Sequence, residues 1–182
     1  PYATADAGAA QSTAADQWEQ GVVPSLYQSD TSWADVPYGQ ATLASTGAAP
    51  VALAMAYVAA TGDTTYTPVE FAQWATDHDL TAAGVDTIGA FLQQGGTAFG
   101  LAVDPMIVDD RTLRHAIVSN VPVLVVTQPG TFAPASSVVV LDDIDKDSHI
   151  VLHDPTSASR SAKGWAFDDI TDAAALAFTV HE

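Results

Sequence analysis

The stretch from Leu43 to Gly62 constrains the fold of this chain more than any other part of its sequence. Between Val51 and Ala60 the only polar group is the hydroxyl of Tyr57, so a helix here must be buried on nearly all sides. Gly62 is a good helix stop, because glycine readily adopts the left-handed conformation that ends many helices. The sequence therefore predicts a central buried helix around which the other elements pack.

The helix begins with alanines at a position whose electrostatics would favour an anionic side chain. A helix N-terminus presents free backbone N–H groups and the positive end of the helix dipole, which favour an anion such as a thiolate. Ala48 and Ala49 occupy this place, directly after a turn-like run from Ser45 to Gly47. The position suits a nucleophile, but the side chains found there are inert.

Size and composition predict one folded domain. The chain has 182 residues, of which 48% are hydrophobic, and this is enough for a sizeable core. Small polar residues dominate the start of the chain, so we expect a flexible tail or linker over residues 1–20 and a domain over residues 21–182. Because the chain begins at Pro1 with no methionine and no apolar signal core, we expect a trimmed or mature piece.

Charge narrows the classes of partner. The net charge is −17, from 22 acidic and 5 basic residues, and a phosphate backbone needs cationic contacts. We therefore expect no nucleic-acid binding, and no membrane insertion because no apolar run is long enough to span a bilayer. A basic peptide or protein would be attracted at long range, although solubility or salt tolerance explains the charge more simply. The acidic, lysine-poor composition favours a secreted or cell-surface bacterial protein.

Metal and cofactor chemistry has little support. The absence of cysteine excludes disulfides, thiolate metal sites and a cysteine nucleophile. Asp143, Asp145 and Asp147 alternate as calcium-loop ligands do, but Ser148 stands where that loop needs glycine, and Asp154 where it needs a bidentate glutamate. We favour a solvated acidic hairpin turn, keep the three aspartates as the alternative, and predict no cofactor.

Periodicity changes along the chain. Thr67, Pro68 and Glu70 form a helix-start signature, in which Thr67 caps, proline suits the first helical position and glutamate completes a capping box. Further helices are predicted over residues 86–99, capped by Asp86 or Thr87, and after Asp109-Asp110. Strands are predicted over residues 22–27, 121–127, 137–141, 149–153, 165–167 and 176–181. Helices followed by an antiparallel sheet indicate an α+β fold.

Eight short motifs follow one another along most of the chain. They are Tyr27-Gln28, Trp33, Pro37-Tyr38-Gly39, Gly47-Ala48-Ala49-Pro50, Ala54-Met55, Thr67-Pro68 with Trp74, Pro129-Gly130-Thr131-Phe132 before the run from Ser137 to Leu141, and Asp154-Pro155. In these motifs and their spacing the chain resembles the C39-like peptidases, a branch of the papain-like cysteine peptidases, over about residues 22–180. The resemblance implies a papain-like fold, with an N-terminal helical half packed on a C-terminal antiparallel β-sheet.

The resemblance also assigns roles to four positions. Gln28 corresponds to the oxyanion-hole donor, Ala48 to the nucleophilic cysteine, Ser137 to the general-base histidine and Asp154 to the third triad member. Alanine has no nucleophile, and a serine cannot accept the proton at neutral pH. Two independent losses point to a chain that is non-catalytic by descent, and not to a single engineered replacement.

A rebuilt hydrolase site is the alternative. Ser45, Thr46 and Ser137 carry hydroxyls near the expected site, but each needs an adjacent base. His153 is the nearest histidine in sequence, and strand alternation points it away from the face of Asp154. We therefore interpret the histidines as surface or strand-face residues.

The function that follows is that of a non-catalytic pseudopeptidase domain, which holds a peptide or protein partner or serves as a scaffold. Gln28, Trp33 and Tyr38 are the candidate ligand-binding residues of its cleft. Equally, Trp33 and Tyr38 could simply cover the N-terminus of the helix. A third alternative is a structural domain of a larger surface protein, with no ligand in the cleft, and the sequence leaves the oligomeric state open.

Overall fold

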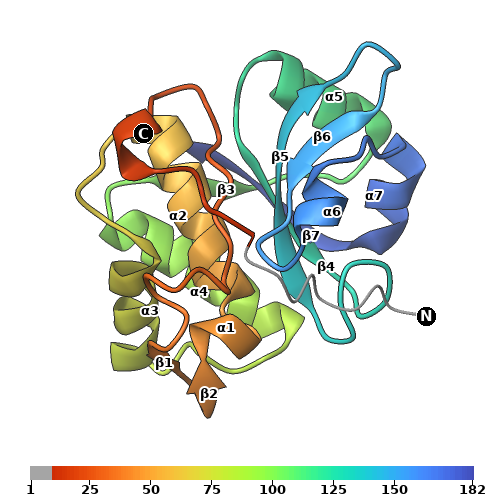
Figure 1. Cartoon of the computed structure of the whole chain (residues 1–182). Coiled ribbons are helices and arrows are strands. Elements are labelled where there is room, and N and C mark those ends of the chain that lie inside the picture. The colour runs from red at the N-terminus through yellow and green to blue at the C-terminus, as the bar shows by residue number, and fades with distance from the viewer. Residues whose placement is uncertain (1–9) are drawn as a thin grey trace.

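The computed structural model describes residues 10–182, which form a five-stranded main sheet with helices on both of its faces and a small two-stranded hairpin (Figure 1). The strands are β1 (Pro37–Tyr38), β2 (Ala41–Thr42), β3 (Ala102–Pro105), β4 (Val123–Thr127), β5 (Ser137–Ile144), β6 (Ile150–His153) and β7 (Ala174–His181). The helices are α1 (Leu43–Thr46), α2 (Ala48–Thr61), α3 (Pro68–Asp77), α4 (Val85–Ala98), α5 (Asp110–Val118), α6 (Ala158–Ser161) and α7 (Phe167–Ala173), after a 3-10 turn, η1 (Ala15–Gln17).

The main sheet has five strands in the order β3-β7-β4-β5-β6, and every pair in it is antiparallel. β1 and β2 form a separate two-stranded hairpin before α1. The predicted class, α+β with an antiparallel sheet, is confirmed.

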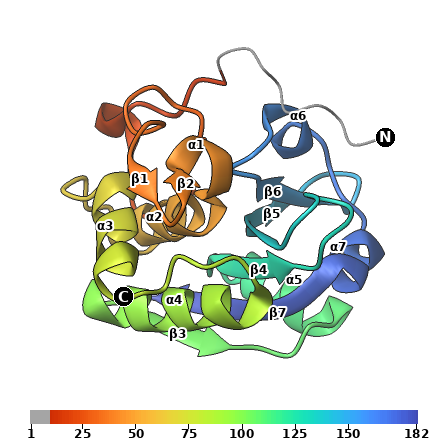
Figure 2. The same cartoon turned by 90° about the horizontal axis from the view of Figure 1, so that it is seen from below.

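Strand alternation divides the core into two halves. Leu124 and Val126 point to one face of the sheet, where they join the apolar side chains of α2 and α4. Val123 and Val125 point to the other face, where they pack with α5 and α7. Figures 1 and 2 show the helices of the first hundred residues gathered on one side of the sheet and α5 and α7 on the other. Because both faces of the central strand are covered, β4 is buried along its whole length.

The predicted central helix is α2. Every residue from Ala48 to Ala59 is buried, and Gly62 ends the helix with φ 70° in the left-handed region. The helix packs between α3 and the sheet, so an all-round apolar surface is what its environment requires. Within residues 10–182 no helix has the length and apolar character to cross a membrane.

Capping was predicted correctly for two helices and wrongly for a third. The backbone N–H of Thr67 donates to Glu70 Oε2 at 2.7 Å, which confirms the capping box of α3, and Asp109 caps α5 by accepting from the N–H of Thr112 at 2.7 Å. α4 instead begins at Val85 after Gly84, with no side-chain cap. Gly84 has φ 130°, which suits glycine, so backbone geometry starts this helix instead of Asp86 or Thr87.

Two strand predictions are wrong, and the strands β1, β2 and β3 were not predicted. Residues 22–27 form no strand, because Pro24 lacks a donor and the N–H groups of Leu26 and Tyr27 bond to the side chains of Met55 and Ser12. Over residues 165–167 only an isolated bridge from Trp165 to Ile150 forms, since α7 begins at residue 167. The edge strand β3 was not predicted; its short sequence becomes a strand by pairing with β7.

The segment expected as a tail lies partly outside the described residues, which begin at residue 10. From there on it contacts the domain. Trp18 is buried in the core with its indole N–H on the carbonyl of Thr13, and Thr13 donates from its backbone to the carbonyl of Ser25 at 2.7 Å.

Candidate functional site

A cavity of about 620 Å³ lies at the start of α2. Its walls come from the loop that carries Gln28, the β1–β2 hairpin, the residues on either side of Gly47, and the segment that leads into β5. Three of the four positions assigned by the resemblance, Gln28, Ala48 and Ser137, line it together. The segments that meet here are more than a hundred residues apart in sequence.

Gln28 is held at the cavity by two hydrogen bonds. Its backbone N–H donates to the carbonyl of Pro155 at 2.9 Å, and its side-chain Nε2 donates to the carbonyl of Ala44 at 2.8 Å. The second bond sets the orientation of the amide, because the reverse orientation would bring two oxygens together. Gln28 Oε1 is buried and has no hydrogen-bond partner.

Ser137 begins β5, and its side chain is 3% exposed. Thr127 Oγ1 accepts from the backbone N–H of Ser137 and donates to the carbonyl of Ser137, both at 3.3 Å, and these bonds fix the start of β5. The hydroxyl Oγ has no partner. In the described part of the chain, Gln28 Oε1 and Ser137 Oγ are the two buried side-chain polar atoms without a hydrogen bond, and both belong to residues that line this cavity.

Asp154 does not join the other three positions. Its Oδ1 accepts from the N–H and hydroxyl of Thr156, at 2.8 and 2.7 Å, and its Oδ2 accepts from Arg160 Nε at 2.6 Å. Since the carboxylate is 1% exposed, it needs these partners to offset its lost hydration. Asp154 therefore organises the turn after β6. Within residues 10–182 its carboxylate has no hydrogen bond to Ser137, so the two residues do not form the pair that the resemblance implies.

Of the two aromatic residues predicted at the cleft, one lines the cavity. Tyr38 does, and burial raises the pKa of its phenol to about 12, so the group stays neutral. Trp33 does not line it: the indole is 7% exposed within the core and donates to the carbonyl of Tyr27 at 2.8 Å. A buried indole N–H requires such a partner, so Trp33 stabilises the loop from within the core. Tyr38 is thus the aromatic residue of the two that a ligand in the cavity would contact.

The chemistry of the cavity wall is mostly neutral. Asp79 is the one charged residue among the described residues that line it, and none of these is a histidine, lysine or arginine. Ser45 and Thr46 are present, and Thr46 Oγ1 donates to the carbonyl of Thr42 at 3.3 Å. The wall thus offers hydroxyls and an amide for hydrogen bonding, with no imidazole beside them to act as a general base.

The acidic run after β5 is a hairpin turn. Asp145 Oδ1 accepts from the N–H groups of Asp147 and His149, at 2.8 and 2.9 Å, and Ser148 takes the left-handed conformation with φ 63°. The hydrogen bond from His149 lowers the pKa of Asp145. Asp143 Oδ1 accepts from the adjacent Ile144 N–H at 2.7 Å. Among the described residues, no three histidine or carboxylate side chains are grouped so that they could hold a metal ion.

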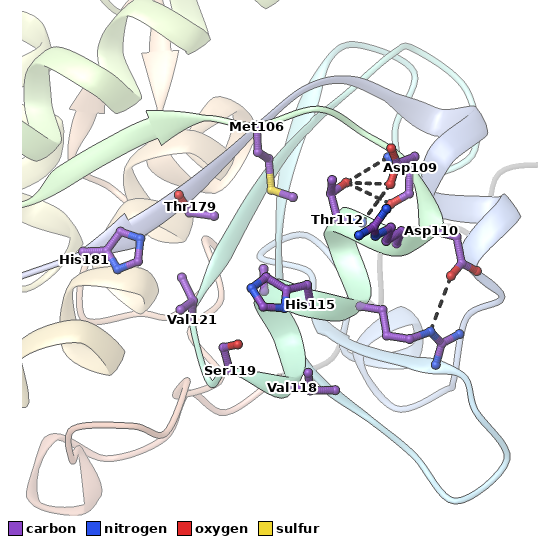
Figure 3. A pocket seen from close by; sticks show the side chains of 13 residues that line it. Met106, Asp109, Asp110, Thr112, His115, Val118, Ser119, Val121, Thr179 and His181 are labelled. Carbon is purple, nitrogen blue, oxygen red and sulfur yellow. Dashed lines mark hydrogen bonds and ion pairs between the residues drawn. The ribbon is translucent and has the colours of Figure 1, made fainter.

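A larger, shallower hollow of about 1080 Å³ lies between α5 and the ends of β3 and β7 (Figure 3). His115 and His181 stand on opposite sides of it in Figure 3, and none of the predicted site residues lines it. Val118, the last residue of α5, is 69% exposed and also lines this hollow. Arg114 and Asp110, which both line the hollow, pair with each other at 3.4 Å, and the guanidinium of Arg114 lies over the ring of Phe167.

Parts of the main cavity were not predicted from the sequence. Its remaining walls include Thr81, Ala82 and Ala83 before α4, and Ala133 to Ser136 before β5. These are small residues in loops, and no sequence pattern marks such residues as neighbours. Comparisons of the chain with models of protein families, with curated proteins and with solved structures gave no match.

Proposed function

We propose that the cavity at the start of α2 binds an extended peptide segment and does not cut it, so that the chain acts as a non-catalytic C39-like pseudopeptidase domain with a papain-like fold. The observation that carries the proposal is the pair of orphaned atoms, Gln28 Oε1 and Ser137 Oγ. A buried polar atom without a partner costs about 1–3 kcal/mol, and such atoms are rare in native structures. Because both atoms are buried in the ligand-free protein, a ligand reaches them only after the lining side chains shift, and one that then supplies partners to both removes this cost.

A peptide backbone has the complementary chemistry. Gln28 Oε1 can accept from a backbone N–H, and the hydroxyl of Ser137 can donate to a carbonyl or accept from a second N–H. Tyr38, Ile88 and the alanines of the wall provide apolar contact for side chains. The cavity volume of about 620 Å³ suits a few residues of an extended segment.

Charge favours a neutral or basic ligand. The chain carries a net charge of −17, and Asp79 lies at the cavity itself. An acidic peptide would be repelled during its approach, whereas a basic one would be steered toward the protein. A partner of this kind fits our further proposal that the domain works in secreted form or at a bacterial cell surface, as a binding or scaffold module.

The alternative, a hydrolase rebuilt at the same cavity, has less support. Ser45, Thr46 and Ser137 would each need an imidazole or another base within hydrogen-bond reach. The described lining residues include no imidazole, and Asp79, the one carboxylate among them, has no hydrogen bond to any of the three hydroxyls. Hydrolysis of Gly-Gly-containing peptides that disappears in Ser137→Ala would overturn the non-catalytic proposal.

Replacing Ser137 with alanine tests the binding mode. We expect Ser137→Ala to weaken the binding of short Lys- and Gly-containing peptides roughly 5- to 30-fold in calorimetric titration, because one ligand hydrogen bond is lost. The same variant should leave the free protein as stable or slightly more stable, since it deletes an unsatisfied hydroxyl. The control is Ser136→Ala, which removes a less buried hydroxyl from the same wall. Equal affinities in the two variants, or no peptide binding at all, would contradict the proposal.

A gain-of-reactivity experiment tests the resemblance itself. Ala48→Cys combined with Ser137→His should create a thiol that iodoacetamide alkylates at least about 10-fold faster at neutral pH than the thiol of Ala48→Cys alone. The reason is that a neighbouring imidazolium stabilises the thiolate at the N-terminus of α2. Equal alkylation rates in the single and double variants would mean that the two positions do not have the relation found in the peptidase family.

A further inference from the structure

Three polar side chains away from the cavity form a continuous hydrogen-bonded chain. Ser25 Oγ lies 2.9 Å from His153 Nδ1, and His153 Nε2 lies 2.9 Å from Asp142 Oδ2. They come from the segment before Tyr27, from β6 and from β5, and Ser25 and His153 are 128 residues apart. None of the three lines the main cavity.

The chain of bonds determines where the protons lie in the neutral state. An ionised carboxylate can only accept, so His153 Nε2 carries the proton that it shares with Asp142. His153 Nδ1 then has a free lone pair, and the hydroxyl of Ser25 donates to it. A hydroxyl that donates to an imidazole, itself oriented by a carboxylate, is the arrangement that activates a serine for nucleophilic attack.

A β-bulge places the carboxylate. β5 pairs with β6 at Leu141–Leu152 and next at Asp143–Val151, which leaves Asp142 as an extra residue in β5. His153 lies opposite Val140 in the pairing of β6 with β5, so these two side chains are on the same face of the sheet. Val140 is two residues before Asp142 in β5. Bulges often redirect a side chain next to an active site, and this one brings Asp142 within hydrogen-bond distance of His153.

The serine is held in place but remains reachable. Its backbone is fixed on both sides by Thr13, whose Oγ1 accepts from the Ser25 N–H at 3.0 Å and whose N–H donates to the Ser25 carbonyl at 2.7 Å. The side chains of His153 and Asp142 are 14% and 25% exposed, and Ser25 is half-buried. All three residues thus keep some contact with solvent, while water competes only in part for the two hydrogen bonds.

We propose that Ser25 is an activated nucleophile, a covalent modification site for uncharged or cationic acyl donors such as activated esters. Ser25 Oγ forms a bond to the carbonyl carbon, its proton passes to His153 Nδ1, and the carbon–oxygen bond to the leaving group breaks. The leaving alkoxide takes the proton from His153, so an ester and a serine become an acyl-serine and an alcohol. The carboxylates of Asp142 and Asp143 disfavour an anionic donor.

The surrounding backbone offers few free donors to a tetrahedral intermediate. The N–H groups of Ser25, Leu26 and Tyr27 donate to Thr13 Oγ1, Met55 Sδ and Ser12 Oγ, so these three are not free to form an oxyanion hole. Without such donors an enzyme loses about 10²- to 10³-fold in rate per donor. Acylation and deacylation both pass through a tetrahedral oxyanion, so both are slowed. An activated ester still acylates Ser25, because its leaving group departs far more readily than the serine alkoxide, and the acyl-serine should therefore accumulate.

The test is covalent labelling of the whole chain with a fluorophosphonate probe and, separately, with p-nitrophenyl acetate, followed by mass-spectrometric mapping of the modified residue. We expect one label per chain, on Ser25, with loss of fluoride or of p-nitrophenol. Ser25→Ala should abolish it. His153→Gln should slow it roughly 100-fold or more, and Asp142→Asn at least about 10-fold. The matched controls, Ser29→Ala, His149→Gln and Asp143→Asn, should label at the wild-type rate.

Two results would overturn the proposal. One is labelling of Ser25 in the wild-type protein no faster than that of the exposed Ser29. The other is equal labelling of Ser25 in His153→Gln and His149→Gln, which would show that the hydrogen bonds only hold the segment against β6. Should circular dichroism show that His153→Gln is unfolded, the comparison of Asp142→Asn with Asp143→Asn decides between the two roles.

Discussion

Gly47→Ala is expected to lower the free energy of unfolding by about 3 kcal/mol, as overpacking at a rigid contact does. A Cβ at this position would lie 2.6 Å from the carbonyl oxygen of Leu43 and 2.8 Å from its Cα. These are backbone atoms of α1, and they can move only if the hydrogen bond from the Gly47 N–H to the Leu43 carbonyl, now 2.9 Å, is broken. Urea unfolding monitored by tryptophan fluorescence measures the effect.

The matched control is Gly100→Ala. Gly100 has φ 86°, but a Cβ there would meet nothing within 4 Å, so its replacement carries only the backbone cost of about 1–2 kcal/mol. A smaller effect at Gly47 than at Gly100 would show that the junction of α1 and α2 is more adaptable than its contacts indicate. Gly47 directly precedes Ala48, which lines the cavity, so Gly47→Ala should also weaken peptide binding there.

Arg160→Ala is the second change with a large expected effect, a loss of about 3 kcal/mol in the free energy of unfolding. It leaves the carboxylate of Asp154, a residue that is 1% exposed, without the one charged partner it has within residues 10–182. Removing one member of a buried ion pair typically costs about 3–5 kcal/mol, and the lower end applies because Arg160 is 17% exposed and Thr156 still donates to Asp154. Thermal and urea unfolding both measure this loss.

Two comparisons make this prediction specific. Arg114→Ala breaks an ion pair with Asp110 whose side chains are 44% and 60% exposed, and it should cost less than about 1 kcal/mol. Adding Asp154→Asn to Arg160→Ala should recover part of the loss, because the double variant no longer buries an unpaired charge. Equal effects of Arg160→Ala and Arg114→Ala would mean that the turn after β6 does not depend on the pair.

Pattern and capping predicted much of the fold because both act over a few residues. The apolar run of α2 needs burial wherever the chain places it, and the hydrogen bonds of Thr67 and Glu70 span one helical turn. The continuous β-branched runs of β4 and of the first half of β5 likewise indicate strands that are buried on both faces. Segments whose state depends on distant partners were the ones missed, as with β3, which is a strand only because β7 lies beside it.

The candidate site was predictable only in part. Gln28, Ala48 and Ser137 were chosen by a resemblance in order and spacing, and they do line one cavity. Trp33 and Asp154 were chosen in the same way, yet a carbonyl of Tyr27 holds the first and Arg160 holds the second. Residue type alone could not show these partners, because buried donors and carboxylates are satisfied by whichever group the fold brings near.

The sequence by itself determined the central helix, the capping of α3 and α5, the α+β class and the strong negative charge. All of these depend on residue type and short spacing. Only the tertiary structure decided which polar atoms are left without a partner at the cavity and which histidine meets a serine and a carboxylate. Hydrogen bonds form within about 3 Å, and only folding sets which residues, 128 positions apart as for Ser25 and His153, come that close.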